Sequence, residues 1–164
     1  MTRLAIVVAG VIALAAGGAL AIALSRSPDP KPHRAAVRNA PDVGVGHTKL
    51  GRILVDRRGH TLYLFRADRH GESTCYDGCA RVWPPAFASP APRVGSGVSA
   101  AKLTTTTRRD HRLQLVYNGH PLYAMSGDTR PGQMAGEGFL GTWFVVSPDG
   151  HEIVAPGTAP SNGY

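Results

Sequence analysis

The chain has 164 residues, and its 18 Lys and Arg outnumber its 11 Asp and Glu, which gives a formal net charge of +7. This length has room for one domain and a tail. Twenty Gly and 13 Pro exclude a helical bundle, because both residues interrupt regular helices. The positive charge favours anionic neighbours such as lipid head groups and wall polymers. The basic residues are scattered, without the block or recognition helix that nucleic-acid binding needs.

An apolar export segment occupies residues 1–24. Arg3 precedes an uncharged run over residues 4–24, which is long enough to cross a hydrocarbon core of about 30 Å as a helix. The run is either a signal peptide cleaved near residues 19–23 or a signal anchor that stays as a transmembrane helix, and its length favours retention. No Cys ends it, which excludes a bacterial lipoprotein anchor. We expect an extracytoplasmic protein, membrane-anchored by this helix or secreted after cleavage.

A Pro-rich linker is expected over residues 25–46, because proline favours a semi-extended chain. The folded domain is expected over residues 47–156, followed by a disordered tail over residues 157–164. The fold class predicted for this domain is mainly β.

Three β-hairpins are predicted in the domain, in each case from two apolar runs that flank a turn sequence. The first joins residues 53–55 to 60–65, the second joins 113–117 to 120–125 through Asn-Gly, and the third joins 143–147 to 151–154 through Pro-Asp-Gly. These turn sequences tolerate the positive φ angles that tight turns need. Apolar side chains on both faces of residues 62–65 predict a strand that is buried on both sides.

Two cysteines lie four residues apart between the first and second hairpins. Cys75 and Cys79 on one turn would have Cα atoms about 6 Å apart, which a disulfide tolerates, and an exported chain meets an oxidising compartment. We expect a disulfide that stabilises by about 2 kcal/mol. The alternative is a pair of thiolates that bind copper or zinc with His70 and a methionine. Trp83, followed by two prolines, is predicted to pack and to end a short helix.

The first two hairpins are copies of one unit. Five residues recur 60 positions later, namely Gly59, His60, Leu62, Tyr63 and Asp68 as Gly119, His120, Leu122, Tyr123 and Asp128. We expect a two-copy hairpin repeat, with copies at about residues 50–85 and 110–154, in which each copy needs the other to bury its apolar side. Asp68 and Asp128, just beyond the strand ends, are expected to accept backbone N–H bonds in the following loops.

These motifs resemble a family of bacterial secreted repeat proteins of unknown function, also called predicted lipoproteins with a Tyr-x-aromatic-x-x-Asp motif. Residues 63–68 (YLFRAD) fit that motif, and residues 73–85, 117–123 and 141–146 are similar to its other conserved stretches. The resemblance implies an envelope location and no established activity. It marks seven residues as framework or binding positions: Tyr63, Phe65, Asp68, Trp83, Tyr123, Asp128 and Trp143. Met125 departs from the pattern, because it replaces the aromatic residue of the second copy.

Candidate metal ligands follow the turn glycines. His60, His120 and His151 would bind zinc or copper if the three turns converged, and Met125 with Met134 and His120 would make a soft copper site. The simpler interpretation is that each His faces solvent at the start of a strand and that each Met fills the core. We therefore expect no cofactor, with copper or zinc as the alternative.

Asp68 and Asp128 would form a catalytic pair only if their carboxyl groups came within roughly 5–10 Å of each other. Asp residues at strand ends more often cap turns, so no catalytic residue is predicted and an enzyme is the third hypothesis. The leading hypothesis is a non-catalytic, envelope-associated binding or structural module. Its expected partners are the membrane through the N-terminal segment, and an anionic envelope polymer or another envelope protein. The runner-up is an extracytoplasmic metal-binding or redox-associated protein.

Overall fold

The structure, a computed structural model, describes residues 40–154. The predicted export segment, most of the predicted linker, the last two residues of the predicted domain and the whole predicted tail lie outside this range. Strands dominate the described part, as the sequence predicts. No helix within residues 40–154 is long and apolar enough to cross a membrane. The elements in chain order are β1 (Gly44–Thr48), β2 (Gly51–Val55), β3 (Tyr63–Phe65), α2 (Asp77–Val82), η1 (Ala100–Lys102), β4 (Leu103–Thr107), β5 (Leu113–Tyr117), β6 (His120–Pro121), η2 (Phe139–Gly141), β7 (Trp143–Val146) and β8 (Glu152–Ile153).

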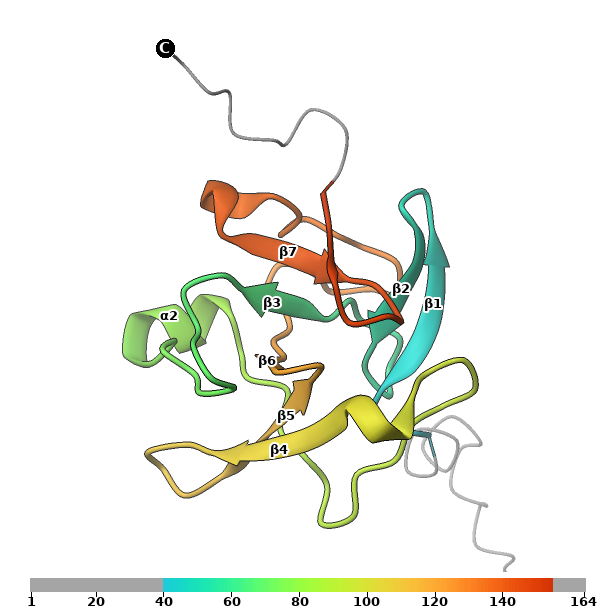
Figure 1. Cartoon of the computed structure of the whole chain (residues 1–164). Helices are drawn as coiled ribbons and strands as arrows, with labels where there is room; N and C mark the ends of the chain where they lie inside the picture. Colours follow the sequence, from blue (N-terminus) through green and yellow to red (C-terminus); the bar gives the residue numbers. More distant parts are fainter. Residues whose placement is uncertain (1–39, 155–164) are drawn as a thin grey trace, which may run out of the picture.

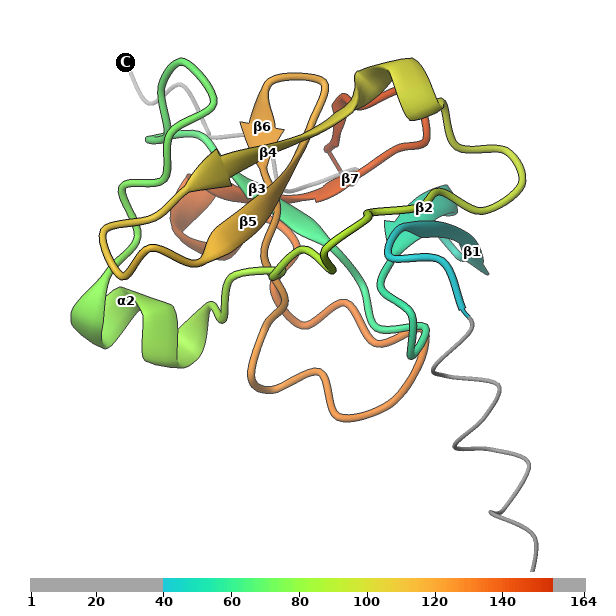
Figure 2. The same cartoon turned by 90° about the horizontal axis from the view of Figure 1, so that it is seen from below.

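The strands of residues 40–154 form three small antiparallel sheets, which are β1–β2, β3–β7–β8 and β4–β5–β6. The β3–β7 pair runs through the middle of the molecule (Figure 1). Seen from below, α2 and the long connection after β6 extend to one side of these central strands, and the ribbons of β4 and β5 cross in front of them (Figure 2). The central pair therefore has protein on both of its faces.

The second and third predicted hairpins are confirmed. β5 pairs with β6 around Asn118 and Gly119, whose φ angles of 51° and 82° are those of the tight turn that this dipeptide favours. β7 pairs with β8 around the predicted Pro-Asp-Gly turn. The first hairpin is only partly formed. Its turn closes through a bridge between Val55 and Thr61, but β3 then leaves β2 and pairs with β7.

The two copies interlock by exchanging their final segments. β7, which ends the second copy, pairs with β3 of the first, and Val146 N–H donates to the Leu62 carbonyl at 3.2 Å. The matching segment of the first copy crosses to the second, where Ala86 N–H donates to the Leu122 carbonyl at 2.9 Å. These two hydrogen bonds are related by the same 60-residue offset. Neither copy can keep this arrangement alone, because each contributes a segment that hydrogen-bonds to the other.

The central strand is buried on both faces, as predicted. Leu64 belongs to one apolar cluster with Leu54, Leu122 and Phe144. Tyr63, the preceding residue, belongs to a second cluster that holds both tryptophans. Because successive side chains of a strand point to opposite faces, β3 contributes to both clusters and joins them into one core.

Asp42 precedes the predicted domain boundary at residue 47 and is packed into the fold. Asp42 is only 4% exposed and its carboxylate accepts hydrogen bonds from Ser89, Arg93 N–H and Arg57. Burial by itself would raise the pKa of Asp42, but the hydrogen bonds outweigh it and hold that pKa below its usual value. Asp42 therefore fastens the start of β1 to two distant loops.

Candidate functional site

The tyrosine and aspartate of the repeat motif form reciprocal hydrogen bonds between the copies. Tyr63 Oη of the first copy donates to Asp128 Oδ2 of the second at 2.5 Å. Tyr123 Oη of the second copy donates to Asp68 Oδ2 of the first at 2.6 Å. The backbones of the two tyrosines also pair, with N–H to carbonyl distances of 2.8 and 3.0 Å. The motif therefore forms the junction of the two copies.

The second oxygen of each carboxylate holds the loop that follows it. Asp68 Oδ1 accepts from Thr74 N–H at 2.7 Å and from the Thr74 hydroxyl at 2.8 Å. Asp128 Oδ1 accepts from Ala135 N–H at 3.0 Å. The expected bonds from the following loops are thus present. Each Asp connects its own loop to the other copy's tyrosine, which is the geometry of an anchor rather than of a carboxylate free to exchange a proton.

Both motif tyrosines are protonated donors at neutral pH. Burial raises the pKa of Tyr63, and its hydrogen bond to Asp128 raises that pKa further. Burial likewise raises the pKa of Tyr123, with an added contribution from Asp68. A phenolate beside a carboxylate would place two negative charges in contact inside the core, so the protonated form is favoured.

A column of stacked aromatic rings lies beside the junction. Trp83 and Trp143 stack with ring centroids 3.9 Å apart, and Phe65 covers the other face of Trp143 at 4.1 Å. Tyr63 packs against Trp83 in a T-shaped arrangement, and Tyr123 packs against Trp143 in the same way. Trp83 and Trp143 are themselves 60 residues apart. The two tryptophans are therefore a further repeat pair, which could have been recognised from the same 60-residue offset.

Met125 takes the place of the aromatic residue in the second copy. It is half-buried and packs against the cluster that contains the two tryptophans. Gly136 shows how tightly this cluster is packed, because a Cβ at that position would lie 2.5 Å from the Trp83 ring. Met125 thus acts here as apolar filler for the space beside the column.

Cys75, just before α2, forms a disulfide with Cys79 in the first turn of that helix, with Cα atoms 5.3 Å apart. Cys75 is buried in the same cluster as Trp83, the residue at which α2 ends. The predicted disulfide is thus present. In this oxidised state neither sulfur is a thiolate, so the dithiolate arrangement of the copper or zinc alternative does not form.

Three of the other candidate metal ligands follow the hairpin turns, and the turns that precede His120 and His151 touch, because Asn118 Nδ2 donates to the Gly150 carbonyl at 3.1 Å. His60 is half-buried, with Nδ1 3.7 Å from Asp56 Oδ2, and His120 lies in β6. His70 and His151 are exposed. Within residues 40–154, no group of three or more His, Cys, Asp and Glu side chains is arranged to hold a metal ion. A copper or zinc site stays a prediction, limited to His and Met ligands while the disulfide is intact.

A buried arginine, which the sequence analysis missed, lies next to the junction. Arg108 is 5% exposed and donates from Nη1 to Ser73 Oγ and Gln114 Oε1, both at 2.6 Å, and from Nη2 to the Cys75 carbonyl at 2.7 Å. Ser73 Oγ is also 2.8 Å from Tyr123 Oη. Because the single Tyr123 proton goes to Asp68, Ser73 is the donor in that contact. A pair of adjacent arginines in sequence reads as surface charge, and only the fold shows that one of them is internal.

Two surface hollows are related by the repeat. The Tyr76 hollow has a volume of about 280 Å³ and the Lys49 hollow about 360 Å³. Four of the five residues that line the Lys49 hollow have counterparts 60 positions away in the Tyr76 hollow. The Tyr76 hollow is lined by Glu72, Ser73, Tyr76, Thr106, Thr107, Arg108 and Arg109, and the Lys49 hollow by His47, Thr48, Lys49, Gly132 and Met134.

Comparison with known proteins identifies the repeat. A family model described as a secreted repeat of unknown function matches residues 44–87 and again residues 104–147, which together cover more than half of the chain. Searches of curated proteins and of solved structures found no match. The two matched segments coincide with the two interlocked copies, and a secreted family agrees with the expected extracytoplasmic location. The chain therefore belongs to the family of secreted repeats of unknown function.

Proposed function

We propose that this secreted repeat protein is a non-catalytic binding module of the cell envelope. The observation that carries the proposal is the reciprocal Tyr–Asp junction. Tyr63 and Tyr123 donate to the carboxylates of the opposite copy, and both oxygens of each carboxylate accept internal hydrogen bonds. The most recognisable polar groups of the family motif are thus used to hold the protein together. We therefore propose that a ligand is recognised by other residues, on the surface of the domain.

The membrane and an anionic envelope polymer are the proposed neighbours. The apolar run over residues 4–24 supports attachment or passage through the membrane, and the excess of basic residues over the whole chain supports attraction to anionic polymers. Nucleic acid is not a proposed partner, because the basic residues form neither a block nor a recognition helix.

The test is co-sedimentation of the intact protein with purified bacterial cell walls at about 0.05 M and about 0.5 M salt. We expect binding that weakens at the higher ionic strength, where exposed charges are screened. A parallel panel of glycan, peptide and ester substrates is expected to show no turnover. Sustained turnover of any of them, abolished by substitution of Asp68 or Asp128 with Asn in a protein that still folds, would contradict the proposal.

A further inference from the structure

The Tyr76 hollow concentrates positive charge around one aromatic ring. The guanidinium carbons of Arg108 and Arg109 lie 4.3 and 4.2 Å from the centre of the Tyr76 ring, so the two carbons are at most 8.5 Å apart. Arg109 is exposed, whereas Arg108 is buried. Two like charges held this close repel each other, and an anion bound near both would relieve the repulsion.

Arg108 has hydrogen-bond partners but no carboxylate partner. Its three acceptors are a hydroxyl, an amide oxygen and a backbone carbonyl, all of them neutral. The ion pairs within residues 40–154 involve neither Arg108 nor Arg109. No completely buried side-chain nitrogen in this range lacks a partner, so Arg108 Nε, which makes no hydrogen bond, is not completely enclosed. A buried cation is normally compensated by an anion. Arg108 lacks one, and its Nε–H group can still donate a hydrogen bond.

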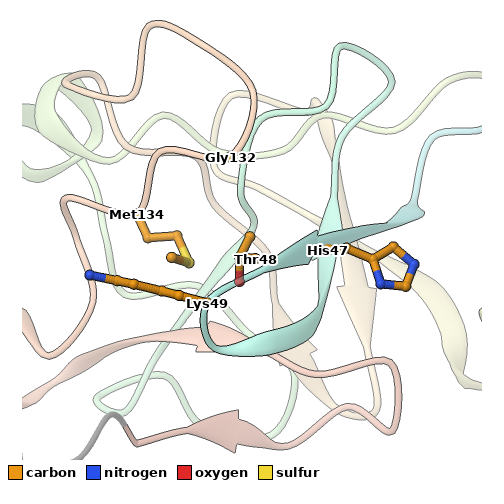
Figure 3. A pocket seen from close by; sticks show the side chains of 5 residues that line it. All are labelled: His47, Thr48, Lys49, Gly132 and Met134. Carbon is orange, nitrogen blue, oxygen red and sulfur yellow. The ribbon is translucent and has the colours of Figure 1, made fainter.

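The repeat-related hollow provides an internal comparison. Lys49 corresponds to Arg109 in the 60-residue offset, but Thr48 replaces Arg108 and Gly136 replaces Tyr76. Figure 3 shows the Lys49 side chain extending beside Met134, while the His47 ring points to the other side of the strand. The Lys49 hollow therefore has one exposed cation and no aromatic support. The pair of guanidinium groups on a ring is therefore found in the Tyr76 hollow and not in the Lys49 hollow.

We propose that the Tyr76 hollow binds a carboxylate or phosphate group of an anionic envelope polymer. Arg109 makes the outer contact and Arg108 Nε the inner one, because guanidinium groups match the geometry of both anions. Thr106 and Thr107 also line this hollow. Glu72 also lines it and is the carboxylate that opposes an incoming anion. This site rests on the proposed binding function and names its ligand class.

The experiment is calorimetric titration of the intact protein with polygalacturonate, polyphosphate and inorganic phosphate. The key comparison is R109Q with K49Q, since each removes one positive charge from repeat-equivalent positions. For the polymer that binds, we expect R109Q to weaken affinity about tenfold and K49Q less than twofold, because a charge-assisted contact to a partly buried site exceeds a general surface charge. E72Q is expected to strengthen binding. The carboxylate and phosphate polymers distinguish the two anion sources, and inorganic phosphate tests whether one group suffices.

Two results would overturn the site. Equal losses in R109Q and K49Q would show attraction to surface charge in general, and the binding function itself would stand. Absence of binding to all three anions would remove the site, while wall binding in the sedimentation test would still support a module with another ligand. Y76L is the second variant, because it removes the ring and keeps both charges, and it is also expected to weaken binding. Unchanged urea midpoints would show that the variants remain folded.

Discussion

Tyr63 and Tyr123 each contribute an apolar ring to the core and a hydroxyl to the opposite copy. Their rings contact the tryptophan column in T-shaped arrangements, at centroid distances of 5.3 and 5.1 Å. Their hydroxyls reach Asp128 and Asp68. Leucine or phenylalanine would fill the same space but would leave the carboxylates without donors, so only tyrosine meets both requirements at this position.

The two hydroxyls are expected to differ in their effect on stability. Asp128 is 5% exposed, whereas Asp68 is half-buried, so water can replace the lost donor only at Asp68. Tyr63→Phe should lower the free energy of unfolding by about 1–3 kcal/mol, the cost of an unsatisfied buried acceptor, and Tyr123→Phe should lower it by less. Urea denaturation measures both values. Tyr76→Phe is the control, and a Tyr63→Phe effect no larger than that of the control would contradict the assignment.

Alkaline pH should unfold the protein through the same tyrosines. The pKa values of Tyr63 and Tyr123 are raised by burial and by the neighbouring carboxylates, whereas the unfolded chain ionises tyrosine near pH 10. Their contribution to stability is therefore fully present below about pH 10 and is lost as the pH rises above it. Urea denaturation at pH 8–11.5, with phenolate absorbance followed in parallel, measures this. Ionisation of both groups near pH 10 in the folded protein would contradict it.

At the residue scale, the residues that recur in both copies were predicted from the sequence, whereas functional residues without a repeat counterpart were missed. Tyr63, Asp68 and their copies were found because a constant offset relates them. The reciprocal pairing between copies was not predictable, because an offset shows equivalence and not contact. Arg108 was missed for a related reason. Its burial depends on Gln114 and the Cys75 carbonyl, which come from a strand and a loop that only the fold brings together.

Among the elements, the strands that contain apolar runs beside a turn sequence were predicted. β1 and β4, which lack these features, were not. β1 is rich in glycine, and Gly46 is required because a Cβ there would lie 2.7 Å from the Val55 side chain. Close packing thus requires glycine at a position where strands usually hold β-branched residues, so the sequence of β1 does not indicate a strand. β4 holds four consecutive threonines, a composition typical of strands that the sequence analysis did not use.

The disulfide should fix α2, a six-residue helix that is too short to be stable by itself. Reduction, or the double replacement Cys75→Ser and Cys79→Ser, should lower the free energy of unfolding by about 2 kcal/mol, because the unfolded chain regains the freedom of a short loop. Urea denaturation with and without reductant gives the value. Near-ultraviolet circular dichroism should also change, since Cys75 lies in the cluster that holds both tryptophans. An unchanged unfolding midpoint after complete reduction would contradict this role.

At the scale of the whole molecule, duplication has produced one cooperative unit rather than two domains. β7 completes the sheet of the first copy, and the segment around Pro85 bridges to Tyr123 in the second. Trp83 of one copy stacks on Trp143 of the other. The sequence analysis predicted that each copy needs the other to bury its apolar side. The exchange of segments shows a stronger dependence, because backbone hydrogen bonds as well as side chains cross the junction.

Native-state hydrogen exchange at the Tyr63 and Tyr123 amides tests this central claim most directly. Each amide donates to the carbonyl of the other residue, at 2.8 and 3.0 Å, so both report on the junction. If the copies form one unit, both amides should exchange only through global unfolding, with the same free energy as urea denaturation gives. The protected amides of β2 and β5 should share that value. Exchange of one copy's amides at a clearly lower free energy than the other's would show two independent units and contradict the account.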